Sequence, residues 1–364
     1  MRKRMNKVLA IVLCGGLMAG VLGGCGAAEE GAKEAAQPAA EETADASEPA
    51  AEENAKQATA SGGKSLFLCP KCVGYDYWTS CETGAKAAAD ELGYDLTFNG
   101  PAATDSAQQI TMMEDAMTQG IAGLGISAND ADAVIDTIAT AKEKGIYTVA
   151  FDSDSPNSDR DYCVIPESDA AMGEQLAEMI AQEMGGEGKL AFMVASLSAE
   201  NQVSKFEAAE AYINEKYPDI EIVATLCSDD ENEHAYENAQ TLLSTYPDLK
   251  GILGFAGAEA PQAAAAVSQA IDNGDLEMGQ ICVTGIGFPS QCREGLKSGV
   301  LKQILSWNPQ ETGKVTVYVL DALLNGKTIE EIEIDGIELR LDGSYVYHGC
   351  VLLTPDNVDD YNYA

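Results

Sequence analysis

The sequence predicts an α/β protein made of two lobes, each with a parallel sheet. After Lys64, short apolar runs alternate with longer segments of helical periodicity, the pattern of repeated β-α units. The same alternation starts again after Pro166, which indicates a second unit of similar construction. About 300 residues remain beyond the N-terminal region, enough for two hydrophobic cores.

The first unit is expected to hold four strands and three helices. Gly93 and Gly145 mark helix ends, because glycine readily adopts the left-handed conformation that closes a helix. Asp105 and Ser106 are candidate N-caps for the middle helix. The expected strands are 65–68, 94–98, 123–126 and 146–151, and the expected helices are 83–92, a segment from 106 onward, and 131–144.

The second unit repeats this order. Its first helix, 170–184, places Met172, Leu176, Met179 and Ile180 on one face, as an amphipathic helix over a sheet requires. The further helices are expected at 201–216, 235–245 and 261–271, and the strands at 190–194, 220–226, 251–255, 281–285 and, beyond the unit, 301–305.

The N-terminus predicts export and lipidation. Four basic residues within the first seven precede an uncharged run, 8–22, and then Gly23-Gly24-Cys25, so residues 1–24 have the organisation of a signal peptide. The run is too short to favour a membrane-spanning helix. Small residues before a cysteine favour cleavage and acylation at Cys25. An ordinary secretory signal with a chance cysteine is the alternative.

The segment 25–64 is expected to be a disordered tether behind the lipidated cysteine. Its Ala, Glu, Gln, Ser and Thr residues leave almost no large apolar side chains, so it cannot bury enough surface to fold. The anchor and the tether together place the folded part at the outer face of the cell membrane.

The composition argues against several classes of function. The formal net charge is −37, from 22 basic and 59 acidic residues, which argues against nucleic acid as a partner. The chain has two histidines, His234 and His348, so histidine-based metal sites and catalytic triads are not expected. With no P-loop or zinc signature either, we expect no enzyme, no metal and no cofactor.

Eight cysteines remain once Cys14 of the signal peptide and Cys25 are set aside. They are scattered over a chain large enough to fold without disulfides, and we expect mostly free thiols. The pair Cys69 and Cys72 forms a C-x-x-C motif, so thiol-redox activity is a competing hypothesis. Against it, 73–78 separate the motif from the predicted helix, whereas a reactive pair normally lies at a helix N-terminus.

Candidate binding residues follow the predicted strands, where open α/β sheets place their ligands. After the first strand come Tyr75, Tyr77 and Trp78, and after 146–151 come Asp152 and Asp154. Aromatic rings stack on the C–H faces of a sugar, while carboxylates accept bonds from its hydroxyls. The aromatic residues could instead pack the loop onto its own domain. The acidic segment also resembles a calcium loop, but the glycine and distant glutamate of an EF-hand are absent.

Several motifs together make the chain resemble the type I periplasmic solute-binding proteins of ABC sugar importers, nearest the branch of autoinducer-2, ribose and rhamnose binders. The resemblance runs from Ser65 to the C-terminus. The motifs are Pro70-Lys71 with Gly74 and Tyr77-Trp78-Thr79-Ser80, Tyr94-Asp95-Leu96-Thr97 with Gly100-Pro101, Phe151-Asp152-Ser153-Asp154, Gly285-Ile286-Gly287-Phe288-Pro289, Gly313-Lys314-Val315 with Asp321-Ala322-Leu323-Leu324, and Val351-Leu352-Leu353.

The resemblance implies roles in binding a ligand between the lobes. Asn201-Gln202 stand where autoinducer-2 binders have an Asp-Gln pair, so an amide replaces a carboxylate, and the proline expected near Ala256 and Ala258 is missing. The full set of implied ligand-binding residues is Lys71, Tyr77, Trp78, Asp152, Asp154, Asn201, Gln202, Ala256, Ala258 and Trp307.

The resemblance further implies two Rossmann-like lobes joined by three hinge crossovers, with 65–165 and 288–325 in the N-terminal lobe and 166–287 and 326–364 in the C-terminal lobe. It implies a monomer that captures a sugar-like molecule, of the autoinducer-2, pentose or deoxyhexose kind. The closed form is then expected to dock on an ABC permease and its ATPase. A ligand sensor that docks on a receptor remains the alternative.

Overall fold

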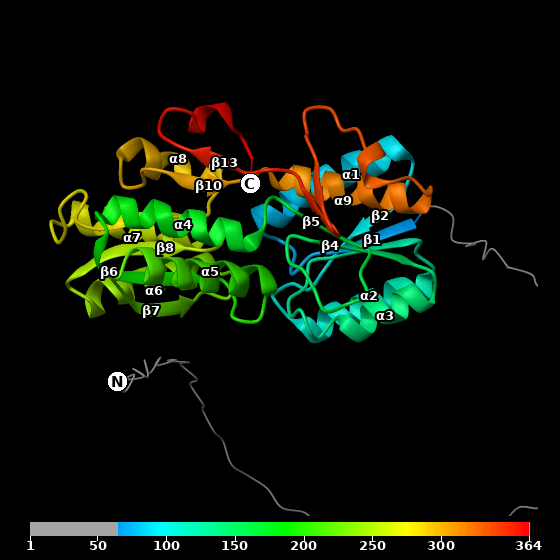
Figure 1. Ribbon diagram of the computed structural model, residues 1–364, viewed down its shortest axis with the longest axis horizontal. Helices are drawn as coiled ribbons and strands as arrows, with labels where there is room; N and C mark the ends of the chain where they lie inside the picture. Colours follow the sequence, from blue (N-terminus) through cyan, green and yellow to red (C-terminus); the bar gives the residue numbers. More distant parts are fainter. Residues whose placement is uncertain (1–64, 364) are drawn as a thin grey trace, which may run out of the picture. The chain divides into compact units, whose positions relative to one another are not determined.

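The computed structural model describes residues 65–363, which form two α/β lobes (Figure 1). The predicted signal peptide, Cys25 and the tether lie outside these residues. No helix within 65–363 has the length and apolarity needed to cross a membrane. The two-lobed α/β prediction is therefore confirmed for the described part of the chain.

The first lobe is built on a seven-stranded sheet within the described residues. Its order is β11-β12-β5-β4-β3-β1-β2, and all neighbours are parallel except β11 and β12. The strands are β1 (Ser65–Cys69), β2 (Asp95–Phe98), β3 (Gly123–Ile126), β4 (Tyr147–Phe151), β5 (Tyr162–Ile165), β11 (Arg340–Asp342) and β12 (Tyr345–Tyr347).

Helices cover both faces of this sheet. On one face α1 (Asp76–Leu92) packs against α9 (Pro309–Leu324), and on the other lie α2 (Ser106–Gln119) and α3 (Ile135–Glu143). The first pair approaches closely through glycine: a Cβ on Gly313 would lie 2.0 Å from the carbonyl oxygen of Cys81. The helix α9, distant in sequence, is thus packed tightly against α1, the helix whose first turn lies at the cleft.

The second lobe has a four-stranded parallel sheet, ordered β7-β6-β8-β9, and a two-stranded antiparallel sheet of β10 and β13. The strands are β6 (Glu187–Val194), β7 (Asp219–Cys227), β8 (Leu249–Gly254), β9 (Cys282–Gly285), β10 (Ile304–Ser306) and β13 (Val351–Leu353). The helices are α4 (Asp169–Met184), α5 (Glu200–Lys216), α6 (Asn232–Thr245), α7 (Glu259–Asp272) and α8 (Pro289–Ser298).

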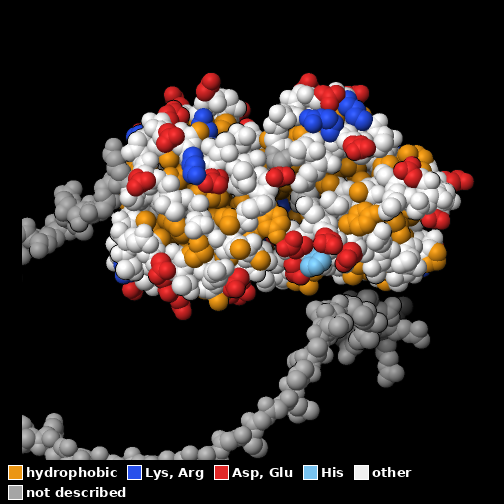
Figure 2. Space-filling model, turned by 180° about the vertical axis from the view of Figure 1, so that it is seen from behind, with side chains coloured by type: hydrophobic (Ala, Val, Ile, Leu, Met, Phe, Trp, Pro, Cys, Tyr) orange, Lys and Arg blue, Asp and Glu red, His pale blue; other side chains and the backbone are white. Residues whose placement is uncertain are grey.

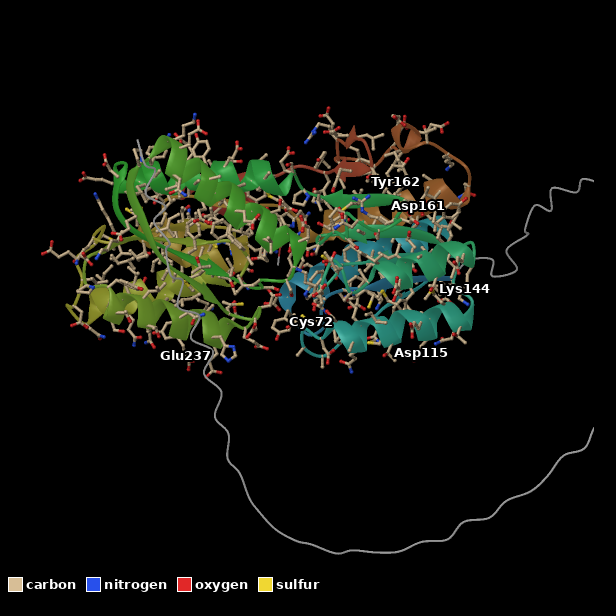
Figure 3. All side chains as sticks on the ribbon, turned by 60° about the horizontal axis from the view of Figure 1, so that its bottom comes forward. Cys72, Asp115, Lys144, Asp161, Tyr162 and Glu237 are labelled. Carbon is tan, nitrogen blue, oxygen red and sulfur yellow. The ribbon has the colours of Figure 1, made fainter. Side chains whose placement is uncertain are left out.

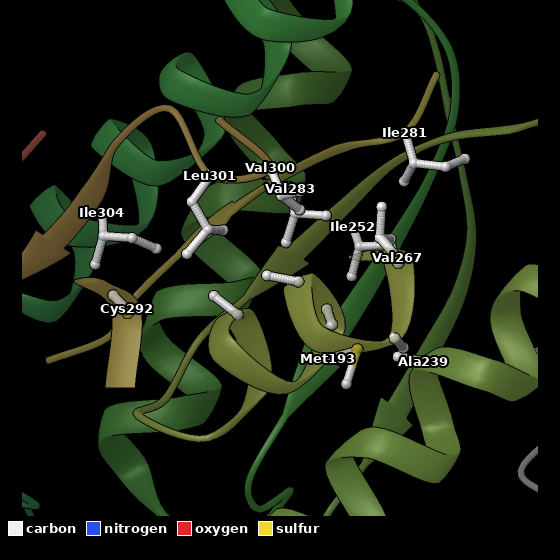
Figure 4. Packing of buried hydrophobic residues seen from close by; sticks show 14 of the residues in the cluster. Met193, Ala239, Ile252, Val267, Ile281, Val283, Cys292, Val300, Leu301 and Ile304 are labelled. Carbon is white, nitrogen blue, oxygen red and sulfur yellow. The ribbon is translucent and has the colours of Figure 1, made fainter. Parts of the chain in front are cut away.

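The core of the second lobe shows where the later segments belong. Cys292 of α8 and Ile304 of β10 are buried in one cluster with Val283 and Ile252 of the parallel sheet (Figure 4). Residues 288–325 were expected in the first lobe, but 288–306 pack into the second because their apolar side chains complete its core.

The third crossing also lies later than expected. The sequence analysis assigned 326–364 to the second lobe, whereas β12 pairs with β5 and extends the first lobe's sheet as far as Tyr347. Between residues 65 and 363 the chain crosses at 166–168, 307–308 and 348–350. The chain thus passes between the lobes three times, and the second and third passages lie later in the sequence than expected.

Most predicted elements are present with small shifts of their ends. Asp105 caps α2 by accepting a hydrogen bond from the Gln108 backbone N–H, as predicted. The main difference is α1, which begins at Asp76 rather than at 83. Tyr77 and Trp78 therefore lie in the first turn of a helix, where their direction is fixed by the helix packing.

Candidate functional site

A cavity of about 370 Å³ lies between the lobes, at the carboxyl ends of strands from both sheets. This is the position that open α/β sheets favour for ligands, and the volume lies in the usual range for small-molecule sites. The lining residues are Lys71, Gly74, Tyr75, Asp76, Tyr77, Trp78, Asp152, Asn201, Gln202, Lys205, Asp230, Asn232, Phe255, Ala256, Gly257, Ala258, Phe288, Gln291 and Trp307.

Asp152 is the acceptor at the centre of this cleft. It follows β4 in a left-handed conformation, with φ of 62°, which is uncommon for a residue other than glycine. Its carboxylate accepts hydrogen bonds from Tyr77 Oη at 2.7 Å, Ser127 Oγ at 3.1 Å and Asn201 Nδ2 at 3.3 Å. These donors hold the carboxylate in one orientation.

Lys71 brings the matching positive charge. Its side chain is buried, with Nζ 3.0 Å from Asn201 Oδ1 and 3.8 Å from Asp152 Oδ2. Asn129 fixes the backbone there by donating to the Lys71 carbonyl at 2.8 Å. Asn201 comes from α5 of the second lobe, so this polar cluster joins the two lobes directly.

Aromatic rings form a wall beside the polar cluster. The centroid of the Tyr77 ring lies 4.7 Å from that of Trp78, 5.3 Å from that of Phe288 and 6.2 Å from that of Trp307. Trp307 Nε1 also donates to Tyr77 Oη at 3.3 Å. Because Trp307 lies on the second crossing, this wall connects the cleft to the hinge.

The second lobe supports its side of the cleft through amide and ammonium groups. Gln202 accepts from the Ala195 N–H at 3.2 Å and donates to the Phe255 carbonyl at 3.3 Å. Lys205 pairs with Asp169 at 2.5 Å and donates to the Asn201 carbonyl. Gln202 thus connects the carboxyl ends of β6 and β8. The positive charge of Lys205 is balanced by Asp169.

The structure brings together nine of the ten predicted ligand-binding residues, all but Asp154. The buried carboxylate of Asp154 pairs with Arg160 and accepts a hydrogen bond from Tyr345 at 2.8 Å. It does not line the cavity. Asp154 therefore ties the loop after β4 to β12 in the first lobe, outside the cavity that the other nine residues line.

Sequence reasoning missed several lining residues of the second lobe, among them Lys205, Asp230, Asn232, Phe288 and Gln291. Two of them carried a usable signal. Asp230 follows the apolar strand β7, where the strand-end rule applies, and Phe288 belongs to a motif quoted for the resemblance. The others lie on helices whose orientation the sequence does not specify.

The C-x-x-C motif lacks the properties of a redox pair. Cys69 and Cys72 are free and buried, and burial raises the pKa of each thiol to about 12. A reactive cysteine needs the opposite, an exposed thiol whose pKa is lowered by nearby positive charge or a helix N-terminus. All eight cysteines of the described region are free thiols, and no cluster within 65–363 could hold a metal ion.

Comparison with known proteins agrees with this geometry. Residues 66–328 match the model of the periplasmic binding protein domain. The D-allose-binding periplasmic protein of Escherichia coli is 23% identical over 71% of this chain and 84% of its own length.

Two solved structures extend the comparison. A solute-binding protein of an ABC transporter from Burkholderia graminis, in complex with D-arabinose, has a TM-score of 0.72 at 25% identity, covering 85% of this chain and 100% of its own. LsrB from Clostridium saccharobutylicum, in complex with AI-2, has a TM-score of 0.73 at 23% identity, covering 82% and 100%.

Two lobes, three crossings and a polar and aromatic cleft between them are the architecture of a two-lobed ligand-binding protein. The chain belongs to the periplasmic binding protein family. The resemblance stated from the sequence motifs is therefore confirmed, as is the prediction that the protein is not an enzyme.

Proposed function

We propose that this protein is the substrate-binding subunit of an ABC importer and that it captures a sugar or sugar-like molecule between its lobes. One observation carries the proposal: Lys71, Asp152 and Asn201, from two lobes, meet in a buried cluster beside an aromatic wall. A sugar ring needs both surfaces, because its hydroxyls require donors and acceptors while its C–H faces pack on aromatic rings.

The relatives support this ligand class. Their printed ligands, D-allose, D-arabinose and AI-2, are small hydroxyl-rich molecules. A ligand that contacts both lobes stabilises the closed arrangement, since it binds that state more tightly than the open one. We propose that the closed protein is the form that the permease recognises, and that it acts as a monomer.

We also propose that Cys25 carries the lipid that holds the protein at the outer face of the cell membrane. The support is the basic, apolar and small-residue order that precedes this cysteine. Labelling of cells with a palmitate analogue tests it. The wild-type protein should take up label and sediment with membranes, and Cys25→Ser should lose both properties. A labelled Cys25→Ser protein would contradict the assignment.

Ligand binding is tested on the chain that begins at Gly26, which lacks the signal peptide and Cys25. Thermal-shift and calorimetric titrations use D-ribose, D-allose, D-arabinose, L-rhamnose and autoinducer-2. We expect one or more of these to bind the wild type, and Lys71→Met and Asp152→Asn to weaken that binding strongly.

The chain offers a matched control for each variant. Lys144 and Asp115 are exposed residues of the first lobe and lie away from Cys72, which marks the cleft end of β1 (Figure 3). Lys144→Met and Asp115→Asn make the same chemical changes outside the cleft, so they should bind as the wild type does. Binding of an amino acid but of no sugar-sized ligand would overturn the proposed function.

A further inference from the structure

Asp230 is a carboxylate of the cleft that the protein itself does not pair. It follows β7 in a left-handed conformation, with φ of 61°, and lines the cavity from the second lobe. Among residues 65–363 it accepts no side-chain hydrogen bond and has no cationic side chain within 4 Å. In this respect it differs from Asp152, whose oxygens are held by three donors.

The charges around the cavity do not balance. Lys205 is matched by Asp169 at 2.5 Å. Three carboxylates line the cavity among the described residues, and one of them, Asp76, is exposed to solvent. Lys71 is then the one ammonium left for the other two, Asp152 and Asp230, and it lies beside Asp152.

A further carboxyl group lies in the same lobe. Glu259, at the start of α7, is fully buried, accepts a hydrogen bond from Ser228, and has no partner for Oε2. Burial raises the pKa of Asp230, and burial followed by the neighbouring Asp230 raises that of Glu259. Lys71 opposes the rise in the pKa of Asp230, and the hydrogen bond from Ser228 opposes it at Glu259, but burial dominates in both carboxyl groups.

Among the described residues that line the cavity, the one buried side-chain atom without a hydrogen-bond partner is an acceptor. Gln291 also lines the cavity, and its buried Oε1 has no hydrogen-bond partner in the described structure. Outside the cavity, exposed acidic side chains lie around an exposed histidine on the same lobe (Figure 2), contributed by the segment that holds Asp229, Glu233, His234 and Glu237. The second lobe therefore offers acceptors and negative charge, and a fitting ligand must bring donors and positive charge.

We propose that the ligand is an amino sugar and that Asp230 binds its ammonium group. This inference rests on the proposed function, because it assigns the class of sugar. An ammonium supplies three donors and one positive charge, so it satisfies the acceptors and brings Lys71, Asp152 and Asp230 into balance. A neutral sugar leaves one excess negative charge in the closed cleft, and a sugar acid leaves two. Buried charge without a partner is costly, so affinity should fall in that order.

The test compares matched sugars on matched variants. Isothermal titration measures binding of D-glucosamine, D-glucose and D-glucuronate, and of D-galactosamine, D-galactose and D-galacturonate, to the exported chain. The variants are Asp230→Asn and, as the control, Asp229→Asn. Asp229 is the neighbouring residue, has a similar φ of 57°, is exposed and does not line the cavity. Thermal denaturation of each variant shows that it is folded.

In the wild type, one of the amino sugars should bind at least about tenfold more tightly than its neutral partner, and the sugar acid most weakly. Asp230→Asn should abolish the preference for the amine and should strengthen binding of the neutral sugar, because it removes the excess negative charge, whereas Asp229→Asn should retain the preference.

Two results overturn the inference while leaving the proposed function standing. One is a neutral sugar that binds the wild type at least as tightly as its amine. The other is an Asp230→Asn variant that still prefers the amine. If no member of this panel or of the neutral panel above binds, the proposed function falls and the amino-sugar assignment falls with it.

Discussion

Replacing Lys71 by methionine is the most direct perturbation of the cleft. Methionine keeps much of the length of the side chain but removes the ammonium group. The variant loses the 3.0 Å hydrogen bond to Asn201 and the pairing with Asp152 at 3.8 Å. The first loss falls on the contact between the lobes and the second falls within the first lobe, while the backbone hydrogen bond from Asn129 to the Lys71 carbonyl can remain.

The geometry sets the size of the effect. At an effective dielectric constant of about 20, two unit charges 3.8 Å apart attract by about 4 kcal/mol. Part of this attraction is offset by the cost of removing both charges from water. A hydrogen bond to a charged group contributes about 1.5–3 kcal/mol net. We therefore expect Lys71→Met to lose about 2–3 kcal/mol of ligand binding free energy, a 30- to 150-fold weaker Kd.

Isothermal titration with the best ligand of the panel measures this change, and Lys144→Met is the control for loss of a lysine charge. Lys71→Arg keeps the charge with a different shape and should bind between the wild type and Lys71→Met. If Lys71→Met binds within about threefold of the wild type, the polar cluster does not contribute to ligand binding and the reasoning fails.

Three further predictions concern groups outside the ligand contacts. Burial raises the pKa of Glu259 to about 7 in the folded protein, against 4.5 for the free group. The folded state therefore binds this proton more tightly than the unfolded state. The free energy of unfolding should fall by up to ~3 kcal/mol as the pH rises from about 4.5 to about 7. Urea unfolding of Glu259→Gln should lack this part of the slope, and parallel curves would refute it. Gly313→Ala should destabilise by at least about 1–3 kcal/mol, because its Cβ would lie 2.0 Å from the Cys81 carbonyl oxygen; an unchanged Tm would contradict the close packing. Asp154→Asn should lower the free energy of unfolding by about 3 kcal/mol, because it leaves Arg160 unpaired. Its ligand affinity should stay within about threefold of the wild type. A loss of affinity without a loss of stability would show that Asp154 contacts the ligand.

The sequence predicted the two-lobed fold and most of its elements because apolar periodicity reports directly on burial. It could not place the last segments. The strand β12 has three residues, Tyr345–Tyr347, and nothing in so short a pattern says which sheet it joins. The strand β5 was missed for a similar reason, since 162–165 read as the start of a crossing rather than as a partner for β4.

The predicted site and the observed cavity differ where backbone conformation decides the direction of a side chain. In an extended strand, Asp152 and Asp154 would point to the same side. The left-handed conformation at Asp152 breaks that alternation, so one carboxylate faces the cleft and the other faces Arg160. Asp230 depends on a turn of the same kind. Sequence shows which residue types follow a strand, but not which way such a turn aims them.

The third crossing between the lobes is hydrogen-bonded to the first crossing and to the helix that follows the second. The His348 and Gly349 N–H groups donate to the carbonyls of Ile165 and Pro166, at 3.2 and 2.9 Å, and the His348 ring shares a 2.9 Å hydrogen bond with Thr312 at the start of α9. We expect segments that are hydrogen-bonded in this way to bend together when the lobes move apart. We therefore expect one distance measured between labels on the two lobes to report on opening of the cleft.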